Sequence, residues 1–294
     1  MNSGGGILVL LVTGLSGEPR FATAFHSTAA VMYDAARTTW GVADSGLAYL
    51  AEDPAQDTAR ITGRSTREGI AGAFAQLVRR SEAGDVIVVL LLGHGSGQGN
   101  DSRLSLPGPD ATAADFAGWL TPLVGRTVVL VNGASGSGDF IAVLSGPDRV
   151  VVTATKNSAQ RNETIFAEYF ARGLTSEAGD GNKDGRVTVL EAFGFARREV
   201  QKAYETKNNL VTEHAQIGDS ALAGTIAFGT TPASKDPRIV ALVAARRSLE
   251  LQVDVLRRKK GTMDSAAYER ELERLLLGIA EMTVEIRATE GRRP

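Results

Sequence analysis

Short runs of apolar, β-branched residues alternate along most of the chain with longer segments whose apolar positions recur at helical spacing. Runs that are apolar on both faces are typical of central strands in a parallel sheet. The longer segments are typical of the helices that connect such strands. The pattern predicts strands at Ile7 to Thr13, Gly46 to Leu50, Asp85 to Gly93, Arg126 to Asn132 and Arg149 to Ala154. It predicts helices at Ala22 to Thr39, Thr66 to Ala83, Thr112 to Leu123, Asp139 to Leu144, Thr164 to Arg172 and Ala192 to Tyr204. We therefore expect an α/β fold with a mostly parallel central sheet between two layers of helices.

From about residue 235 the pattern changes. Apolar residues follow a spacing of three and four over Ile239 to Leu256 and again over Tyr268 to Ile286, on either side of Lys259-Lys260-Gly261-Thr262. This predicts a C-terminal helical hairpin over residues 235–294, preceded by an α/β domain over 7–234 and a flexible start over 1–6. Two roles for the hairpin stay open: packing on its own α/β domain, or forming a homodimer or binding another partner.

Composition narrows the classes of partner. The chain has 294 residues, enough to bury a core, and its 32 basic and 34 acidic residues give a formal charge of −2, which disfavours nucleic acid and anionic membranes. The absence of cysteine excludes disulfides and thiolate chemistry. The apolar run Ile7 to Val12 is far shorter than the ~20 residues of a membrane helix, so no span is expected. We expect a soluble bacterial protein whose compartment stays open: cytoplasmic, or exported if a signal peptide once preceded this sequence.

Glycines flank a histidine directly after the third predicted strand, in the sequence Gly93-His94-Gly95. Open parallel sheets bind their ligands along the edge where the strands end. A histidine there is suited to general acid–base chemistry near neutral pH, and neighbouring glycines let a substrate chain approach the ring. His94 is therefore a candidate catalytic residue.

The next strand ends in small residues and serines, Asn132-Gly133-Ala134-Ser135-Gly136-Ser137-Gly138, ahead of a short apolar helix. Since neighbouring strand ends meet at one sheet edge, we expect Ser135 to lie near His94. Backbone amides at this position, including that of Gly136, are suited to stabilising an oxyanion. The alternative is that Ser135 and Ser137 only cap the helix.

Together these two segments resemble the caspase, metacaspase and legumain group of cysteine peptidases. In that group one strand ends in the catalytic histidine and the next in a Cys-x-Ser-Gly motif. Two later segments, Arg149 to Thr155 and Glu191 to Ala196, also resemble bacterial caspase-like proteins. The resemblance covers roughly residues 7–230 and implies a caspase-like three-layer α/β/α fold. It also implies that His94 holds the histidine position, Gly95 that of the oxyanion-binding glycine, and Ser135 that of the nucleophile. An alignment shifted by one residue places Ala134 there instead.

A serine at the nucleophile position changes the chemistry. A thiol ionises readily beside an imidazole, whereas a hydroxyl needs a base that a third group orients, as in the serine-protease triad. No acid in the sequence is clearly paired with His94. We therefore expect a pseudopeptidase that binds a polypeptide in the former catalytic cleft. The alternative is an active endopeptidase or hydrolase that uses a Ser135/His94 dyad.

Residues 180–191 fit the twelve-residue EF-hand calcium loop at every required position. Hard oxygen ligands of this kind are those that Ca²⁺ prefers. The predicted ligands are the side chains of Asp180, Asn182, Asp184 and Glu191 and the backbone carbonyl of Arg186. The alternative is a metal-free acidic turn capped into the helix that follows.

The remaining candidates carry less information. The order Ser135, Asp180 or Asp184, His214 is that of an α/β-hydrolase triad, although the calcium loop explains these acids better. Glu213 and His214 alternatively form a satisfied pair on the surface.

Three charged residues near strand ends, Glu18, Arg20 and Asp139, are candidates to line a specificity pocket. The glycine spacings miss the patterns of dinucleotide and phosphate loops, so neither of these ligands is expected.

Overall fold

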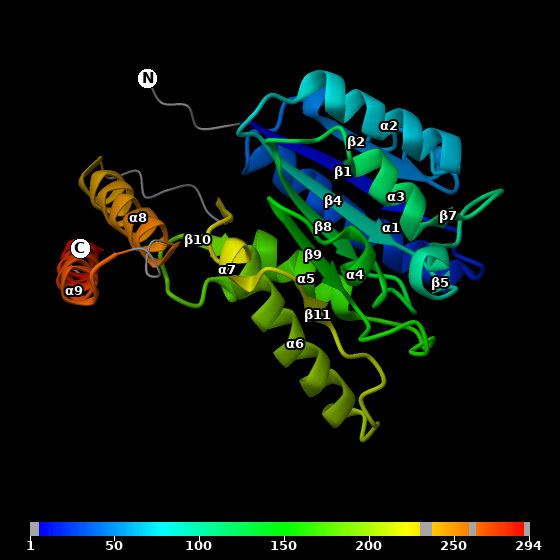
Figure 1. The fold of residues 1–294 in the computed structure, drawn as a ribbon. Coiled ribbons are helices and arrows are strands. Elements are labelled where there is room, and N and C mark those ends of the chain that lie inside the picture. The colour runs from blue at the N-terminus through cyan, green and yellow to red at the C-terminus, as the bar shows by residue number, and fades with distance from the viewer. Residues whose placement is uncertain (1–5, 230–236, 259–262, 291–294) are drawn as a thin grey trace. The chain divides into compact units, whose positions relative to one another are not determined.

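The computed structural model describes residues 6–229, 237–258 and 263–290. Contacts divide the chain into two units, residues 1–230 and 231–294, and Figure 1 labels the elements of both. The predicted turn at 259–262 and all but the last residue of the predicted flexible start lie outside the described residues. No helix within the described ranges is long and apolar enough to cross a bilayer.

A seven-stranded sheet lies at the centre of the first unit (Figure 1). Its order is β11-β9-β8-β4-β1-β2-β3, and every neighbouring pair is parallel except β11 with β9. The strands are β1 (Ile7–Thr13), β2 (Leu47–Ala51), β3 (Gly63–Arg64), β4 (Val86–Leu92), β8 (Thr127–Asn132), β9 (Arg149–Thr153) and β11 (Gln216–Ile217). The predicted strands are confirmed to within one residue at each end.

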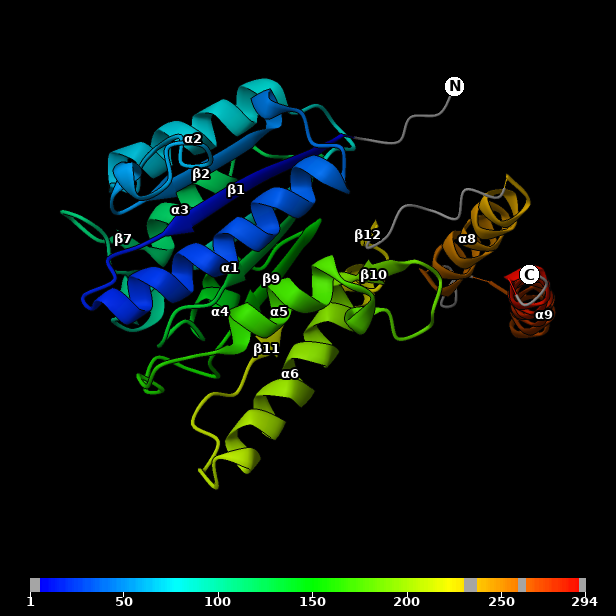
Figure 2. The same cartoon turned by 180° about the vertical axis from the view of Figure 1, so that it is seen from behind.

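Helices cover both faces of this sheet (Figure 2). One layer contains α1 (Pro19–Thr38), α5 (Phe166–Thr175), α6 (Val189–Thr206) and the short α7 (Ser220–Ala223), and the other contains α2 (Arg67–Arg80), α3 (Ala113–Leu120) and α4 (Phe140–Leu144). Alternate residues of β1 enter the two cores: Val9 lies in the first and Leu10 in the second. A strand buried on both faces must be apolar throughout. The predicted α/β fold with two helical layers is thereby confirmed.

Smaller elements surround the central sheet. Two short antiparallel sheets combine β5 (Gly95–Ser96), β6 (Arg103–Leu104) and β7 (Ala111–Thr112), and β10 (Arg186–Thr188) with β12 (Ala227–Gly229). Single 3₁₀ turns cover Asp44–Gly46, Pro54–Gln56, Gly99–Asp101 and Glu177–Gly179. The first small sheet folds the chain back onto the end of β4, where the Ser105 amide donates to the His94 carbonyl at 2.8 Å. It therefore holds the backbone of the loop that carries His94.

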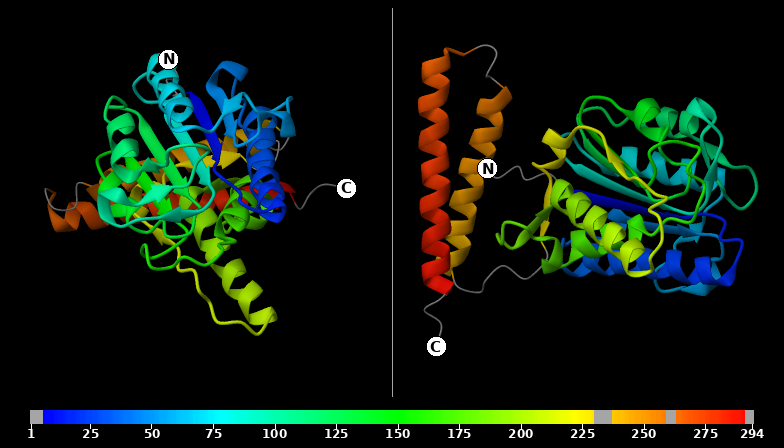
Figure 3. Two further views of the ribbon diagram at one scale, coloured as in Figure 1. Left: turned by 90° about the vertical axis from the view of Figure 1, so that its right-hand side faces the viewer. Right: turned by 90° about the horizontal axis from the view of Figure 1, so that it is seen from below.

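The second unit is a pair of helices, α8 (Pro237–Arg258) and α9 (Ser265–Glu290), which Figure 3 shows side by side. Their contact consists of Val253, Leu256, Tyr268 and Leu275, flanked by Leu249, Met263, Leu272 and Ile279. Arg246, which interrupts the apolar stripe in the sequence, is 4% exposed and donates to the Thr283 hydroxyl at 3.5 Å. The helical hairpin is confirmed, and its role stays a prediction.

Asp115 links two helices of one layer. Its carboxylate accepts hydrogen bonds from the amide and hydroxyl of Thr112, the residue that caps α3, each at 2.9 Å. The same carboxylate pairs with the Arg67 guanidinium at the start of α2. The hydrogen bonds from Arg67 are the main reason that the pKa of Asp115 is lowered to about 2.

The free energy of unfolding should fall as Asp115 takes up a proton. Because the folded-state pKa lies below that of the unfolded chain, the stabilisation is complete above about pH 4 and is lost as the pH falls toward about 2. Urea midpoints of the wild type should therefore drop further between about pH 5 and pH 2.5 than those of Asp115→Asn. The exposed Asp101, replaced by Asn, serves as control. Equal drops in all three proteins would contradict this role.

Candidate functional site

The loops that follow β4 and β8 lie against each other at the carboxyl edge of the sheet. The two strands pair in parallel up to Leu91 and Asn132, so their following residues emerge side by side. The Gly95 amide donates to the Ser135 hydroxyl at 3.3 Å, and the Gly99 amide donates to Asp139 Oδ2 at 2.8 Å. Asp139 thus joins the two loops.

The imidazole of His94 is turned toward α1. Its Nε2 lies 3.1 Å from the backbone carbonyl oxygen of Ser16, and its ring packs edge-on against Phe21 and Phe25 with centroids 4.6 and 5.6 Å away. A carbonyl only accepts, so we assign the proton to Nε2, which leaves Nδ1 unprotonated in the neutral ring. The Ser16 carbonyl and the two aromatic rings therefore fix the orientation of His94.

Ser135 is 4% exposed, and its hydroxyl oxygen accepts the hydrogen bond from Gly95. Among the hydrogen bonds of the described residues, none joins this hydroxyl to the imidazole of His94. The Gly136 amide donates to the backbone carbonyl of Gln160 at 2.8 Å. The Gly95 and Gly136 amides, the two predicted oxyanion donors, are therefore both engaged within the protein.

Neither serine caps the helix that follows. Helix α4 begins after Asp139 with no side-chain cap. The hydroxyl of Ser137 lies 3.3 Å from that of Thr155, while that of Ser135 faces Gly95. The alternative that the two serines only cap this helix is therefore wrong, because both hydroxyls bond to neighbouring loops rather than to the helix start.

An acidic cavity of about 500 Å³ opens beside Ser16. Its walls include the carboxylates Glu18, Glu52 and Asp53 and no lysine or arginine. Glu52 Oε2 accepts hydrogen bonds from the amide and hydroxyl of Ser16, at 2.9 and 2.6 Å. Glu18 was a predicted lining residue, whereas Glu52 and Asp53 were missed, although both directly follow β2 at the edge where parallel sheets bind ligands.

Arg20, also predicted to line a pocket, instead forms ion pairs on the exposed start of α1. Its guanidinium lies 3.0 Å from Glu18 and 3.3 Å from Glu163. The ion pair with Glu163 links α1 to the loop before α5, and Arg20 is not among the residues that line the acidic cavity.

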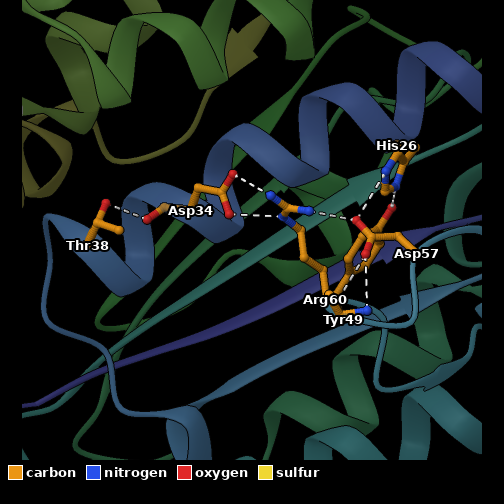
Figure 4. Close-up of polar contacts among 7 residues, drawn as sticks. His26, Asp34, Thr38, Tyr49, Asp57 and Arg60 are labelled. Carbon is orange, nitrogen blue, oxygen red and sulfur yellow. Dashed lines mark hydrogen bonds and ion pairs between the residues drawn. The ribbon is translucent and has the colours of Figure 1, made fainter.

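A second histidine belongs to a polar network that the sequence did not indicate (Figure 4). The ring nitrogens of His26 lie 3.1 Å from the Tyr49 hydroxyl and 3.5 Å from Asp57 Oδ2. Arg60 donates to Asp57 at 2.8 Å and to both oxygens of Asp34 at 2.9 Å. Burial raises the pKa of Tyr49 to about 12, and the Arg60 hydrogen bond lowers the pKa of Asp57. The network holds the loop after β2, which forms one wall of the acidic cavity, against α1.

The predicted calcium loop is closed by its own side chains. Both oxygens of Asp180 accept backbone amides, from Asp184 at 3.1 Å and Gly185 at 2.8 Å, and Gly185 has the positive φ (80°) of a sharp turn. Glu191 forms a capping box with Thr188, whose amide and hydroxyl donate to Glu191 Oε2 at 2.9 and 2.8 Å. One oxygen of the predicted bidentate ligand is thus used at the helix start.

The other predicted ligands also face the loop. Asn182 accepts the Asp184 amide at 2.9 Å, and Asp184 accepts the Arg186 amide at 2.8 Å. Within the described residues, no group of three or more His, Asp or Glu side chains is arranged to hold a metal ion. These hydrogen bonds are those of an acidic turn capped into a helix, and calcium binding stays a prediction.

His214, the candidate histidine of a hydrolase triad, and its neighbour Glu213 each have other partners. His214 Nδ1 lies 2.5 Å from the side-chain nitrogen of Gln160. Glu213 is 3% exposed and accepts the amides of Ile165 and Phe166 at the start of α5, at 3.0 and 3.1 Å. Burial raises the pKa of Glu213. The expectation of a surface pair is therefore wrong for Glu213, whose carboxyl group is enclosed at the helix start.

Known proteins resemble this chain in structure rather than in sequence. Neither a family model nor a curated protein matches the sequence. The chain is similar to the crystal structure of protein GSU0716 from Geobacter sulfurreducens, with 12% identical residues and a TM-score of 0.44. The similarity covers 80% of this chain and 96% of that one. At this identity and TM-score it says nothing about a ligand or an activity.

Gly95 is expected to tolerate no side chain. A Cβ there would lie 2.4 Å from the Ser135 carbonyl oxygen and 2.9 Å from that of Arg103, and neither backbone atom moves cheaply. Gly95→Ala should lower the free energy of unfolding by about 2 kcal/mol or more, measured by urea denaturation. Gly118→Ala, in open space on α3, should be neutral or stabilising by about 0.5–1 kcal/mol. Equal stabilities of the two variants would contradict the close approach at Gly95.

Proposed function

We propose that the protein binds a polypeptide at the carboxyl edge of its sheet and does not hydrolyse it. The observation that carries this proposal is that the groups needed for a Ser135/His94 mechanism already have partners. Serine attack requires a base hydrogen-bonded to the hydroxyl and free donors for the oxyanion. Here the hydroxyl accepts from Gly95, the imidazole faces Ser16, and the Gly136 amide is used by Gln160.

Support for a caspase-like origin comes from the Gly93-His94-Gly95 and Ser135-Gly136-Ser137-Gly138 segments and from the parallel pairing of the strands that carry them. The ligand we favour carries a basic side chain. Three carboxylates line the acidic cavity beside Ser16; Glu18 is paired with Arg20, while Glu52 and Asp53 form no ion pair with a described residue. A cavity lined by one sign of charge attracts the opposite sign. A lysine or arginine of the bound polypeptide matches this cavity.

A peptide library incubated with the protein should show no cleavage that depends on the proposed residues. The measurement is mass spectrometry of products from wild type, His94→Ala and Ser135→Ala. An arginine-containing peptide should nevertheless bind, several-fold more weakly to Asp53→Asn than to wild type, because Asp53 lines the acidic cavity and forms no ion pair with a described residue. The control is Glu168→Gln, an exposed acid on α5. Cleavage abolished by both alanine variants would establish the active hydrolase instead.

We also propose that residues 180–191 bind Ca²⁺. The favouring observation is that the second oxygen of Glu191 stays near the loop, 3.6 Å from where a Cβ on Gly181 would lie, while Oε2 caps the helix. Asp180, Asn182 and Asp184 offer further oxygens on the same loop. The ion would replace amide hydrogen bonds to these side chains and stabilise the folded state.

Calcium should raise the melting temperature relative to chelator. A ligand that binds only the folded chain stabilises it by RT ln(1 + [L]/Kd), so millimolar Ca²⁺ should give a shift of several degrees for a micromolar site. Asp180→Ala should lose this calcium-dependent shift, whereas Glu177→Ala, a carboxylate just outside the loop, should keep it. Identical melting in calcium and chelator for the wild type would refute the proposal.

A further inference from the structure

A second, larger cavity of about 940 Å³ lies along α6, far along the chain from the acidic cavity. One wall is a face of α6 that includes Leu190, Phe193 and Arg197, and the other is the segment that returns from the end of α6 toward β11. Figures 1 and 2 show this segment running back beside the helix. We call this cavity the α6 groove.

Three cations line the α6 groove: Lys156 from the loop after β9, and Arg197 and Arg198 from α6. None of the three forms an ion pair with a described residue. Two carboxyl groups also line the groove, but Glu213 is enclosed by the amides at the start of α5, and Glu205 accepts a hydrogen bond from Gln201 at 2.8 Å. Glu205 is exposed and keeps its charge, but the three cations outnumber it, so the net charge that faces a ligand is positive.

Apolar surface accompanies these charges. Leu190 is 38% exposed at one end of the groove, Val211 is half-buried in the returning wall, and the Arg197 guanidinium lies 5.7 Å from the ring centre of Phe193. Gly194 lies among these residues on α6 and contributes no side chain. A ligand that combines negative charge with apolar groups fits such a surface.

The returning wall of the α6 groove contains backbone amides without a hydrogen-bond partner among the described residues. The amides of residues 210–214 donate to no atom of the described residues, and this stretch belongs to no helix, strand or turn. Glu213 holds the wall in place, because its carboxylate also accepts the Tyr204 hydroxyl of α6 at 3.3 Å. A fixed run of unpaired amides beside apolar surface is the arrangement to which an extended peptide adds as a strand.

We propose that the α6 groove binds an extended acidic peptide, whose backbone pairs with residues 210–214 and whose carboxylates meet Lys156, Arg197 and Arg198. Alternate side chains of an extended peptide point to opposite sides, so acidic residues alternating with leucine place carboxylates on one side of the peptide and apolar groups on the other. This site does not depend on the acidic cavity or on the proposed function of the sheet edge.

The test uses the full chain and a fluorescein-labelled peptide that alternates glutamate with leucine. Fluorescence anisotropy should show binding that weakens with added salt and is lost when lysine replaces each glutamate. The double variant Arg197→Glu/Arg198→Glu should bind about tenfold more weakly or worse, whereas Lys202→Glu, on α6 but outside the groove, should bind as wild type does. A peptide N-methylated at alternate residues should also lose affinity, because it cannot pair as a strand.

Gly194→Leu provides a variant that fills the groove without removing charge. Leucine is a better helix former than glycine, and its Cβ would lie 3.4 Å from the flexible end of Arg198, so the helix should stay intact. This variant should lose peptide binding. Equal affinity for acidic and basic peptides, or unchanged binding by Gly194→Leu, would overturn the proposal. Self-association that the double variant abolishes, with no peptide bound, would overturn it in favour of a second copy of the chain.

Discussion

The close approach of two backbones, at Gly95 and Ser135, is the constraint on which the edge of the sheet depends. Two strands buried on both faces end side by side, and their loops have space for only one another's main chain at this point. The hydrogen bond from the Gly95 amide to the Ser135 hydroxyl follows from that proximity. In the non-hydrolytic function that we propose, this hydrogen bond occupies the amide and the hydroxyl that a serine mechanism would use.

The two cavities have linings of opposite charge, and different elements of the fold supply them. The acidic cavity lies where β1 and β2 end, and the α6 groove gathers its cations from a helix and from the loop after β9. A nearly neutral chain therefore carries two local fields that its formal charge of −2 conceals. Charge that is balanced overall argues against a polyanion such as nucleic acid, but it says little about ligands the size of a few residues.

The amino-acid sequence was sufficient for the strands that are apolar on both faces and for the helices between them. The edge strands β3 and β11 were missed because two residues each carry no periodicity. The side-chain partners at the site could not be predicted either. His94 is oriented by the backbone carbonyl of Ser16. Every residue has such a carbonyl, so the sequence does not show which one the imidazole will meet. Thr188 to Glu191 illustrates a different limit, since the same residues satisfy both a calcium-loop pattern and a capping box.

Glu213 couples two parts of the structure that are far apart in the chain. One carboxylate closes the start of α5 and, through Tyr204, ties the returning segment to α6. The order of a core helix and the position of an exposed wall are consequently set by the same buried group. Thr164, two residues before α5, donates its hydroxyl to the Gly133 carbonyl, so the same helix start is also tied to the loop that contains Ser135.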